Sequence, residues 1–159
     1  VYNNATFDKS YWVAGKRTDP SDMPKTGSAS YSGIAKGHYY QNLQYAGTLN
    51  GTVNIGVNFG LGTVNGTLDL NRFDGTTFVN STISNGSITD SDFKADLTGY
   101  SAVASSSPTS SHIHYTKNAI QGSFYGGDSS TTPPELGGTF NINKSNGEVG
   151  TGIFAAKKN

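Results

Sequence analysis

The sequence predicts an all-β protein: a single antiparallel, eight-stranded up-and-down β-barrel with an N-terminal extension. Three observations predict this fold. Apolar residues alternate with polar ones along several segments, turn-forming residues separate these segments, and almost no segment has the helical period. The alternation is clearest in 48–59, where the even positions are polar or glycine and the apolar odd positions are Leu49, Val53, Ile55, Val57 and Phe59.

Eight segments are expected to form strands, and short turns join most of them. In order, the predicted strands are 27–36, 48–59, 64–70, 76–83, 90–99, 118–125, 136–142 and 149–156. Turn-forming residues lie between them at 60–62, 71–75, 85–86 and 146–147. The only helix-like candidate is a single turn at 129–135. Because no helix crosses over between strands, the sheet is predicted to be antiparallel.

Glycines inside the strands favour a barrel over a sandwich. Glycine weakens a strand, and its usual place there is a sharp bend or a close approach of two backbones. A small closed barrel needs both, since its strands tilt and coil around a narrow interior. The mid-strand glycines are Gly33, Gly51, Gly56, Gly66, Gly122, Gly138 and Gly152. The outward positions carry Asn, Thr, Asp and Lys, so we expect a water-soluble barrel rather than a membrane barrel.

Three segments lie outside this pattern. We predict that 1–26 is an N-terminal extension, an extra short strand or a cap over one end, and that 27–159 is the barrel domain. Two connections, 38–46 and 100–117, are predicted as long loops. Loops of such length are often functional, so both are candidates for binding.

Composition excludes several classes of function. The 11 basic and 11 acidic side chains cancel, and no Lys/Arg run occurs, which argues against nucleic-acid binding. No stretch approaches the ~20 apolar residues of a membrane helix. The absence of cysteine excludes disulfides, thiolate zinc sites and cysteine nucleophiles. A low-charge chain rich in Asn, Thr and Gly suits the exterior of a bacterium, and we expect a monomer.

The segment 38–46 is the first candidate binding site. It holds His38, Tyr39, Tyr40 and Tyr45, and we predict that these residues contact a partner protein at the mouth of the barrel. Tyrosine suits interfaces because it offers a large area and a hydroxyl group with little rotamer entropy. The alternative is that one or two of the rings fold inward and plug the end of the barrel.

The segment 100–117 is the second candidate. In an extended chain His112 and His114 lie on the same face, and with Tyr115 they would suit a transition metal or haem iron. Two histidines are too few for a closed zinc site, and the alternative is an ordinary solvated loop. We therefore predict no metal and no cofactor, with haem as the one possible exception.

No catalytic motif is present. The sequence has no nucleophile elbow, P-loop, dinucleotide fingerprint or HExxH motif, and nothing selects a carboxylate pair for hydrolysis. The segment 90–92 resembles half of a calcium loop but lacks its remaining ligands. Six Asn-x-Ser/Thr sequons are interpreted as a by-product of Asn- and Thr-rich outward faces. We predict that the protein is not an enzyme.

Several blocks of sequence resemble one known family. They are M-P-K-T-G-S-A-S-Y-S-G at 23–33 after Trp12, G-S-F-Y-G at 122–126, E-L-G-G-T-F at 135–140 and G-I-F-A-A-K at 152–157. In this order they resemble the β-barrel domains of transferrin-binding protein B and related bacterial surface lipoproteins, which include haemophilin-like and complement factor H-binding proteins. The chain departs from the family pattern at 126–134, which is longer than usual, and within these residues we expect no handle domain of the kind that larger relatives have.

The resemblance implies a barrel on the outer-membrane surface of a Gram-negative bacterium, either lipid-anchored through a segment before residue 1 or secreted. It implies binding without catalysis, and we expect capture of a host iron or haem carrier such as transferrin or haemoglobin. The alternatives are direct haem binding, capture of a complement regulator, a role in colonisation, and a structural role as an anchor or export signal. The family motifs build the barrel, so they transfer no binding residues.

Overall fold

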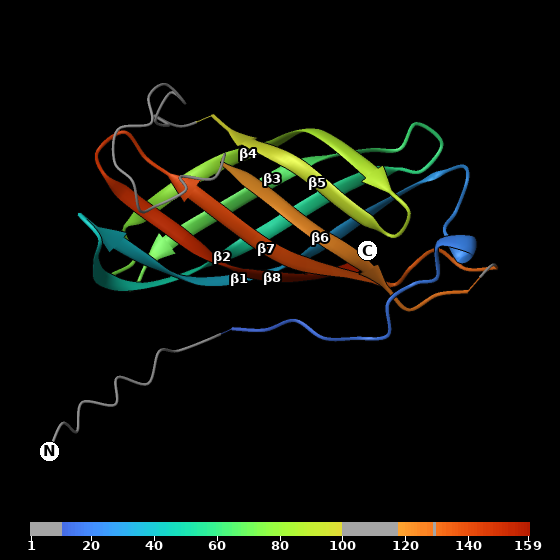
Figure 1. Ribbon diagram of the computed structural model, residues 1–159, viewed down its shortest axis with the longest axis horizontal. Helices are drawn as coiled ribbons and strands as arrows, with labels where there is room; N and C mark the ends of the chain where they lie inside the picture. Colours follow the sequence, from blue (N-terminus) through green and yellow to red (C-terminus); the bar gives the residue numbers. More distant parts are fainter. Residues whose placement is uncertain (1–10, 100–117, 129) are drawn as a thin grey trace, which may run out of the picture.

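The computed structural model describes residues 11–99, 118–128 and 130–159. Within them, eight antiparallel strands follow one another around a closed barrel, which confirms the predicted fold (Figure 1). A short 3-10 helix, η1 (Pro20–Asp22), precedes the barrel. The strands are β1 (Ser28–Gln41), β2 (Gln44–Asn58), β3 (Thr63–Arg72), β4 (Thr77–Thr89), β5 (Asp92–Thr98), β6 (Ala119–Tyr125), β7 (Glu135–Asn143) and β8 (Glu148–Lys158).

Strand β1 closes the barrel, because it pairs with β2 on one side and with β8 on the other. The turns of the β1–β2, β3–β4 and β7–β8 hairpins lie at one end, which we call the hairpin end. The start of β1, the end of β8 and η1 lie at the opposite end (Figure 1). No helix in the described part of the chain is long and apolar enough to cross a membrane.

The inward-facing side chains fill the barrel. The largest fully buried rings are Tyr31, Phe124, Phe140 and Phe154. The Tyr31 hydroxyl donates a hydrogen bond to the Pro133 carbonyl at 2.9 Å, and burial raises the pKa of Tyr31 to about 12. The interior is therefore an aromatic core, in which the Tyr31 phenol remains protonated, and not a channel.

The prediction of a long loop at 38–46 is wrong. Residues up to Gln41 belong to β1, residues from Gln44 belong to β2, and only Asn42 and Leu43 form the turn. Both turn residues have positive φ, 50° and 68°, as a tight hairpin turn with the twist of its strands requires. Large aromatic residues at adjacent positions hid the alternation from the sequence.

Two smaller expectations also fail. Asn85 and Gly86 do not form a turn, since β4 continues through them to Thr89 and the two residues form a bulge opposite β5. An Asn-Gly pair predicts a turn because both residues tolerate positive φ. Asn85 does have a positive φ (51°), but within a bulge. The helix-like turn expected at 129–135 is not helical in its described residues, where β7 already begins at Glu135.

Residues 11–18, which we call the arm, run along the outside of the barrel wall (Figure 1). The arm pairs with the end of β6: the Thr18 amide donates to the Phe124 carbonyl at 3.0 Å, and the Gly126 amide donates to the Lys16 carbonyl at 2.8 Å. After the arm and η1, Met23 enters the core, where it is 5% exposed. The extension thus covers part of the wall and one end of the barrel.

Candidate functional site

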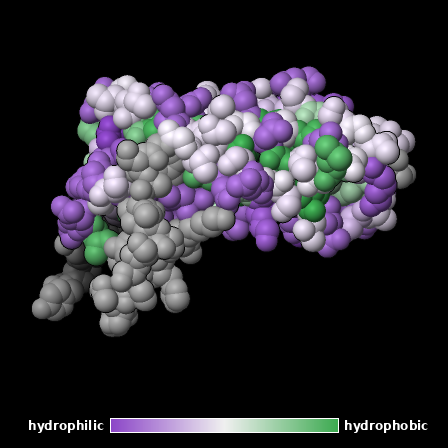
Figure 2. Space-filling model, turned by 90° about the horizontal axis from the view of Figure 1, so that it is seen from above, coloured by the Kyte–Doolittle hydropathy of each residue, from purple (hydrophilic) through white to green (hydrophobic). Residues whose placement is uncertain are grey.

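Most of the surface is polar or neutral, and hydrophobic residues gather only in small areas of the face that Figure 2 shows. Three of the exposed large hydrophobic side chains lie at the hairpin end, in the turn regions of neighbouring hairpins. These are Leu43 (58% exposed), Tyr45 (58%) and Phe73 (68%), which we call the apolar rim. The Phe73 ring lies against Gly47 of β2, two residues from Tyr45, so the β3–β4 turn contacts the β1–β2 hairpin beside the rim.

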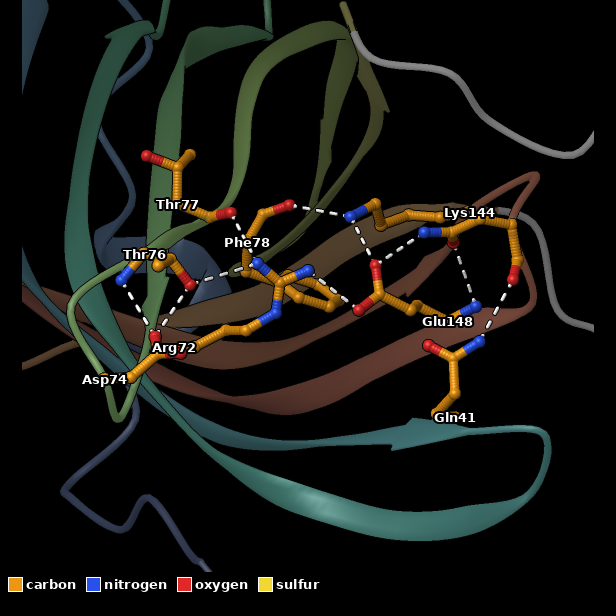
Figure 3. A network of polar contacts seen from close by, with 9 residues as sticks. Gln41, Arg72, Asp74, Thr76, Thr77, Phe78, Lys144 and Glu148 are labelled. Atoms are coloured by element: carbon orange, nitrogen blue, oxygen red, sulfur yellow. Dashed lines mark hydrogen bonds and ion pairs between the residues drawn. The ribbon is translucent and has the colours of Figure 1, made fainter.

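An ionic network lies inside the barrel beneath the rim (Figure 3). It consists of Arg72 of β3, Lys144 of the β7–β8 turn and Glu148 of β8. Arg72 Nη2 donates to Glu148 Oε1 at 2.7 Å, and Lys144 Nζ donates to Glu148 Oε2 at 2.6 Å. Because its members come from different hairpins, the network ties the β3–β4 and β7–β8 turns together.

The network is fully hydrogen-bonded and packs on aromatic rings. Arg72 lies 5.5 Å from the centre of the Tyr39 ring, and Lys144 lies 4.6 Å from that of Phe78. Burial raises the pKa of Glu148, but hydrogen bonds from Lys144, Asn146 and Arg72 outweigh that effect and lower the pKa to about 2. The carboxylate is therefore charged at neutral pH, and the rim stands on a rigid base.

The predicted aromatic residues separate onto the two faces of the β1–β2 hairpin. Tyr39 points inward and packs on Phe78 at 5.6 Å between ring centres. His38, Tyr40 and Tyr45 form a cluster on the outer face, with ring centres 5.5 Å apart for His38–Tyr45 and 6.1 Å for Tyr40–Tyr45. Tyr39 therefore fills the end of the barrel, which was the alternative offered from the sequence, while contact of His38, Tyr40 and Tyr45 with a partner stays a prediction.

The arm completes this outer cluster. The Tyr11 ring packs edge-on against His38 at 5.0 Å between ring centres, and it leaves His38 only 8% exposed. His38 Nε2 has no hydrogen-bond partner among the described residues. We call Tyr11, His38, Tyr40 and Tyr45 the aromatic cluster. Nothing in the sequence indicated that Tyr11 would meet a residue 27 positions away.

Other candidate sites do not converge on chemistry. His112, His114 and Tyr115 lie outside the described residues, so haem or metal binding there stays a prediction. Among the described residues, no group of three or more His, Asp or Glu side chains is placed to hold a metal ion. A shallow groove of about 600 Å³ over β4–β7 includes Asp92, which is already bound by Arg17 and Ser123.

The network residues are the functional candidates that the sequence did not reveal. Arg72, Lys144 and Glu148 were not singled out, because each is an isolated charge beside a turn. Lys144 and Glu148 flank the predicted turn at 146–147, and this was the only available signal. Their partnership with Arg72 depends on contact between residues 76 positions apart.

The comparisons with known proteins agree with this geometry. Residues 23–158 match the family model of the C-lobe and N-lobe β-barrels of transferrin-binding protein B. The chain therefore belongs to this family of β-barrel domains from binding proteins, and the predicted resemblance is confirmed. No curated protein matches the chain.

Solved structures give the same result. The chain is similar to a double mutant of transferrin-binding protein B from Haemophilus parasuis (27% identity, TM-score 0.58, covering 91% of this chain and 28% of that one). It is also similar to the isotype 1 protein from serogroup B Neisseria meningitidis (25% identity, TM-score 0.55, covering 90% and 28%). Intact Ap-TbpB, at 24% identity and TM-score 0.60 (91% and 28%), supports the fold alone. The chain spans under a third of the length of each of these structures.

Proposed function

We propose that the protein is a binding module on the outer surface of a bacterium, lipid-anchored or secreted, that captures a host iron-carrying protein of the transferrin type. The observation that carries this proposal is the apolar rim: three large side chains exposed at the same end of the barrel, above the ionic network. Exposed apolar patches with aromatic members are typical of protein interfaces. Family membership and the names of the solved relatives support the choice of partner.

The structure of the rim suits capture rather than catalysis. Leu43 and Phe73 project from tight turns, where little conformational freedom is lost on binding. The charged groups beneath them are already paired with one another and are not directed at a substrate. In this proposal, an aromatic or aliphatic surface of the partner covers the rim, and no cofactor is needed.

Binding of transferrin to the immobilised protein tests the proposal, with haemoglobin and a complement regulator in parallel. We expect Tyr45→Ala and Phe73→Ala each to weaken binding by about 5- to 30-fold, the range for interface aromatics near a hot spot. Both side chains are largely exposed, so the thermal unfolding midpoint should remain within about 2 °C of the wild type.

Leu61→Ala is the matched control, because Leu61 is 75% exposed in the β2–β3 turn at the opposite end. We expect it to leave the affinity unchanged. Preferential binding of haemoglobin or the complement regulator would replace transferrin as the partner. Equal loss of affinity in Leu61→Ala and the rim variants, or no binding of any of the three proteins, would reject the proposal.

A further inference from the structure

The arm holds the barrel by two unequal parts. Residues 16–18, which we call the foot, make the two backbone hydrogen bonds described above. In addition, the Thr18 hydroxyl donates to the Gly126 carbonyl at 2.5 Å. Arg17 Nε donates to Ser91 at 3.0 Å, and its guanidinium pairs with Asp92. Residues 11–15, which we call the tip, make no hydrogen bond with the described residues. There the tip is attached by side-chain packing alone.

The tip covers a polar atom that it does not satisfy. Tyr11 buries His38 from the outside, yet Nε2 of the imidazole ring has no partner in the described part of the chain. A buried nitrogen without a hydrogen bond has lost its hydration, and no hydrogen bond within the protein compensates for that loss. The contact between Tyr11 and His38 is therefore a weak cover, which a ligand able to pair with Nε2 can replace.

The surroundings of His38 indicate which ligand this would be. Lys36, two residues earlier on the same outer face, is the only Lys, Arg, Asp or Glu in β1 and β2. The outer face of this hairpin thus offers one cation, one imidazole nitrogen and the rings of Tyr40 and Tyr45, with no carboxylate to repel an acidic group. A protein segment with a carboxylate next to an aromatic or aliphatic side chain complements it.

We propose, resting on the function proposed above, that the outer face of the β1–β2 hairpin is a second contact surface that Tyr11 covers in the free protein. The partner displaces the tip and places a hydrogen-bond acceptor, an Asp or Glu carboxylate, on His38 Nε2. The foot of the arm stays paired with β6 during this exchange. The surface adjoins the apolar rim through Tyr45, which belongs to both.

Chemical modification of the whole chain tests the cover without a partner. Diethyl pyrocarbonate acylates accessible imidazoles, and mass spectrometry of peptides gives the rate at His38. We expect Tyr11→Ala to raise this rate between about two- and twelvefold, the range that one edge-to-face aromatic pair supports. Trp12→Ala is the control, since Trp12 is 79% exposed, and it should leave the rate unchanged.

Binding of transferrin, haemoglobin and a complement regulator tests the displacement. Tyr11→Ala should tighten binding by a similar factor, because the partner no longer has to displace the ring. His38→Phe keeps the aromatic packing, removes the nitrogen and should weaken binding.

An unchanged modification rate in Tyr11→Ala would show that Tyr11 does not cover His38, even where binding is normal. Weaker binding by Tyr11→Ala, or unchanged binding by His38→Phe, overturns the contact. If none of the three proteins binds the wild type or Tyr11→Ala, the proposed function fails, and this inference fails with it.

Discussion

At the scale of single residues, one carboxylate pairs with two cations from different hairpins. The side chain of Glu148 is 7% exposed, and those of Arg72 and Lys144 are 20% and 17% exposed. Buried charges are tolerated only when they are paired and hydrogen-bonded, and all three groups here satisfy that condition. Removal of the shared carboxylate leaves two cations together in a confined space.

We therefore expect Glu148→Gln to destabilise the protein by about 3 kcal/mol at neutral pH, the loss typical of a broken buried pair. Urea unfolding followed by circular dichroism measures this loss. Asp74→Asn is a suitable comparison, because Asp74 is fully exposed and accepts its side-chain hydrogen bonds from Thr76 in its own turn, so its attraction to Arg72 is screened by water. An effect of Glu148→Gln no larger than that of Asp74→Asn would contradict a stabilising role for the network.

The same carboxylate predicts a pH dependence. Its folded-state pKa, about 2, lies below the ordinary value of 4.5. The charged form therefore stabilises the folded state above about pH 4.5, and this contribution disappears as the pH falls toward 2. We expect the stability difference between the wild type and Glu148→Gln to be full near neutral pH and to shrink toward zero at about pH 2. A difference of constant size across this range would contradict the assignment.

At the scale of elements, close backbone contacts between strands give the barrel its tight coil. A Cβ atom added at Gly138 of β7 would lie 1.9 Å from the Gln121 carbonyl oxygen of β6, which only a backbone shift could relieve. Gly60, in the β2–β3 turn, is the opposite case. Its added Cβ would meet nothing closer than the Asn58 side chain at 3.5 Å, and its φ is not in the left-handed region.

We expect Gly138→Ala to destabilise the protein by at least about 3 kcal/mol, because the β6–β7 pairing must open to admit the methyl group. Gly60→Ala should be neutral or stabilising by up to about 1 kcal/mol, since it restricts only the unfolded chain. Parallel urea titrations of the two variants measure both effects. A Gly138→Ala protein as stable as Gly60→Ala would show that the close approach is not needed.

Among the elements, the β1–β2 hairpin was the one least accurately predicted. The alternation of 48–59 and 64–70 was strong enough to locate β2 and β3. The continuation of β1 through His38, Tyr39 and Tyr40 was missed, because three consecutive large side chains show no apolar–polar alternation. Their faces are distinguished only by packing: Tyr39 meets Phe78 inside, and His38 meets Tyr11 outside.

At the scale of the whole molecule, the arm is an addition to a complete barrel. The family match begins at residue 23, so the arm lies outside it. The closed sheet and its core involve no residue of the arm, although the arm covers Gly137 and part of the wall. The barrel should therefore fold without the arm.

We expect a chain that lacks residues 1–18 to keep its β-sheet circular dichroism spectrum and to unfold cooperatively. Its stability should fall by about 2 kcal/mol, since the lost foot contributes a few hydrogen bonds of ~1 kcal/mol each, offset by the entropy of ordering the arm. Thermal and urea unfolding measure the change. Loss of the cooperative transition would mean that the arm is part of the folding unit.

The sequence by itself determined the fold class, the number and order of the strands, and the family, because alternation, turn residues and glycine positions are local properties of the chain. Only the tertiary structure decided which residues meet across the barrel. Arg72 reaches Glu148, and Tyr11 covers His38, through contacts that exist only once β1 has paired with β8 and the arm has docked on the wall. Such contacts join distant positions that no local pattern relates, and closure of the sheet is the physical event that brings them together.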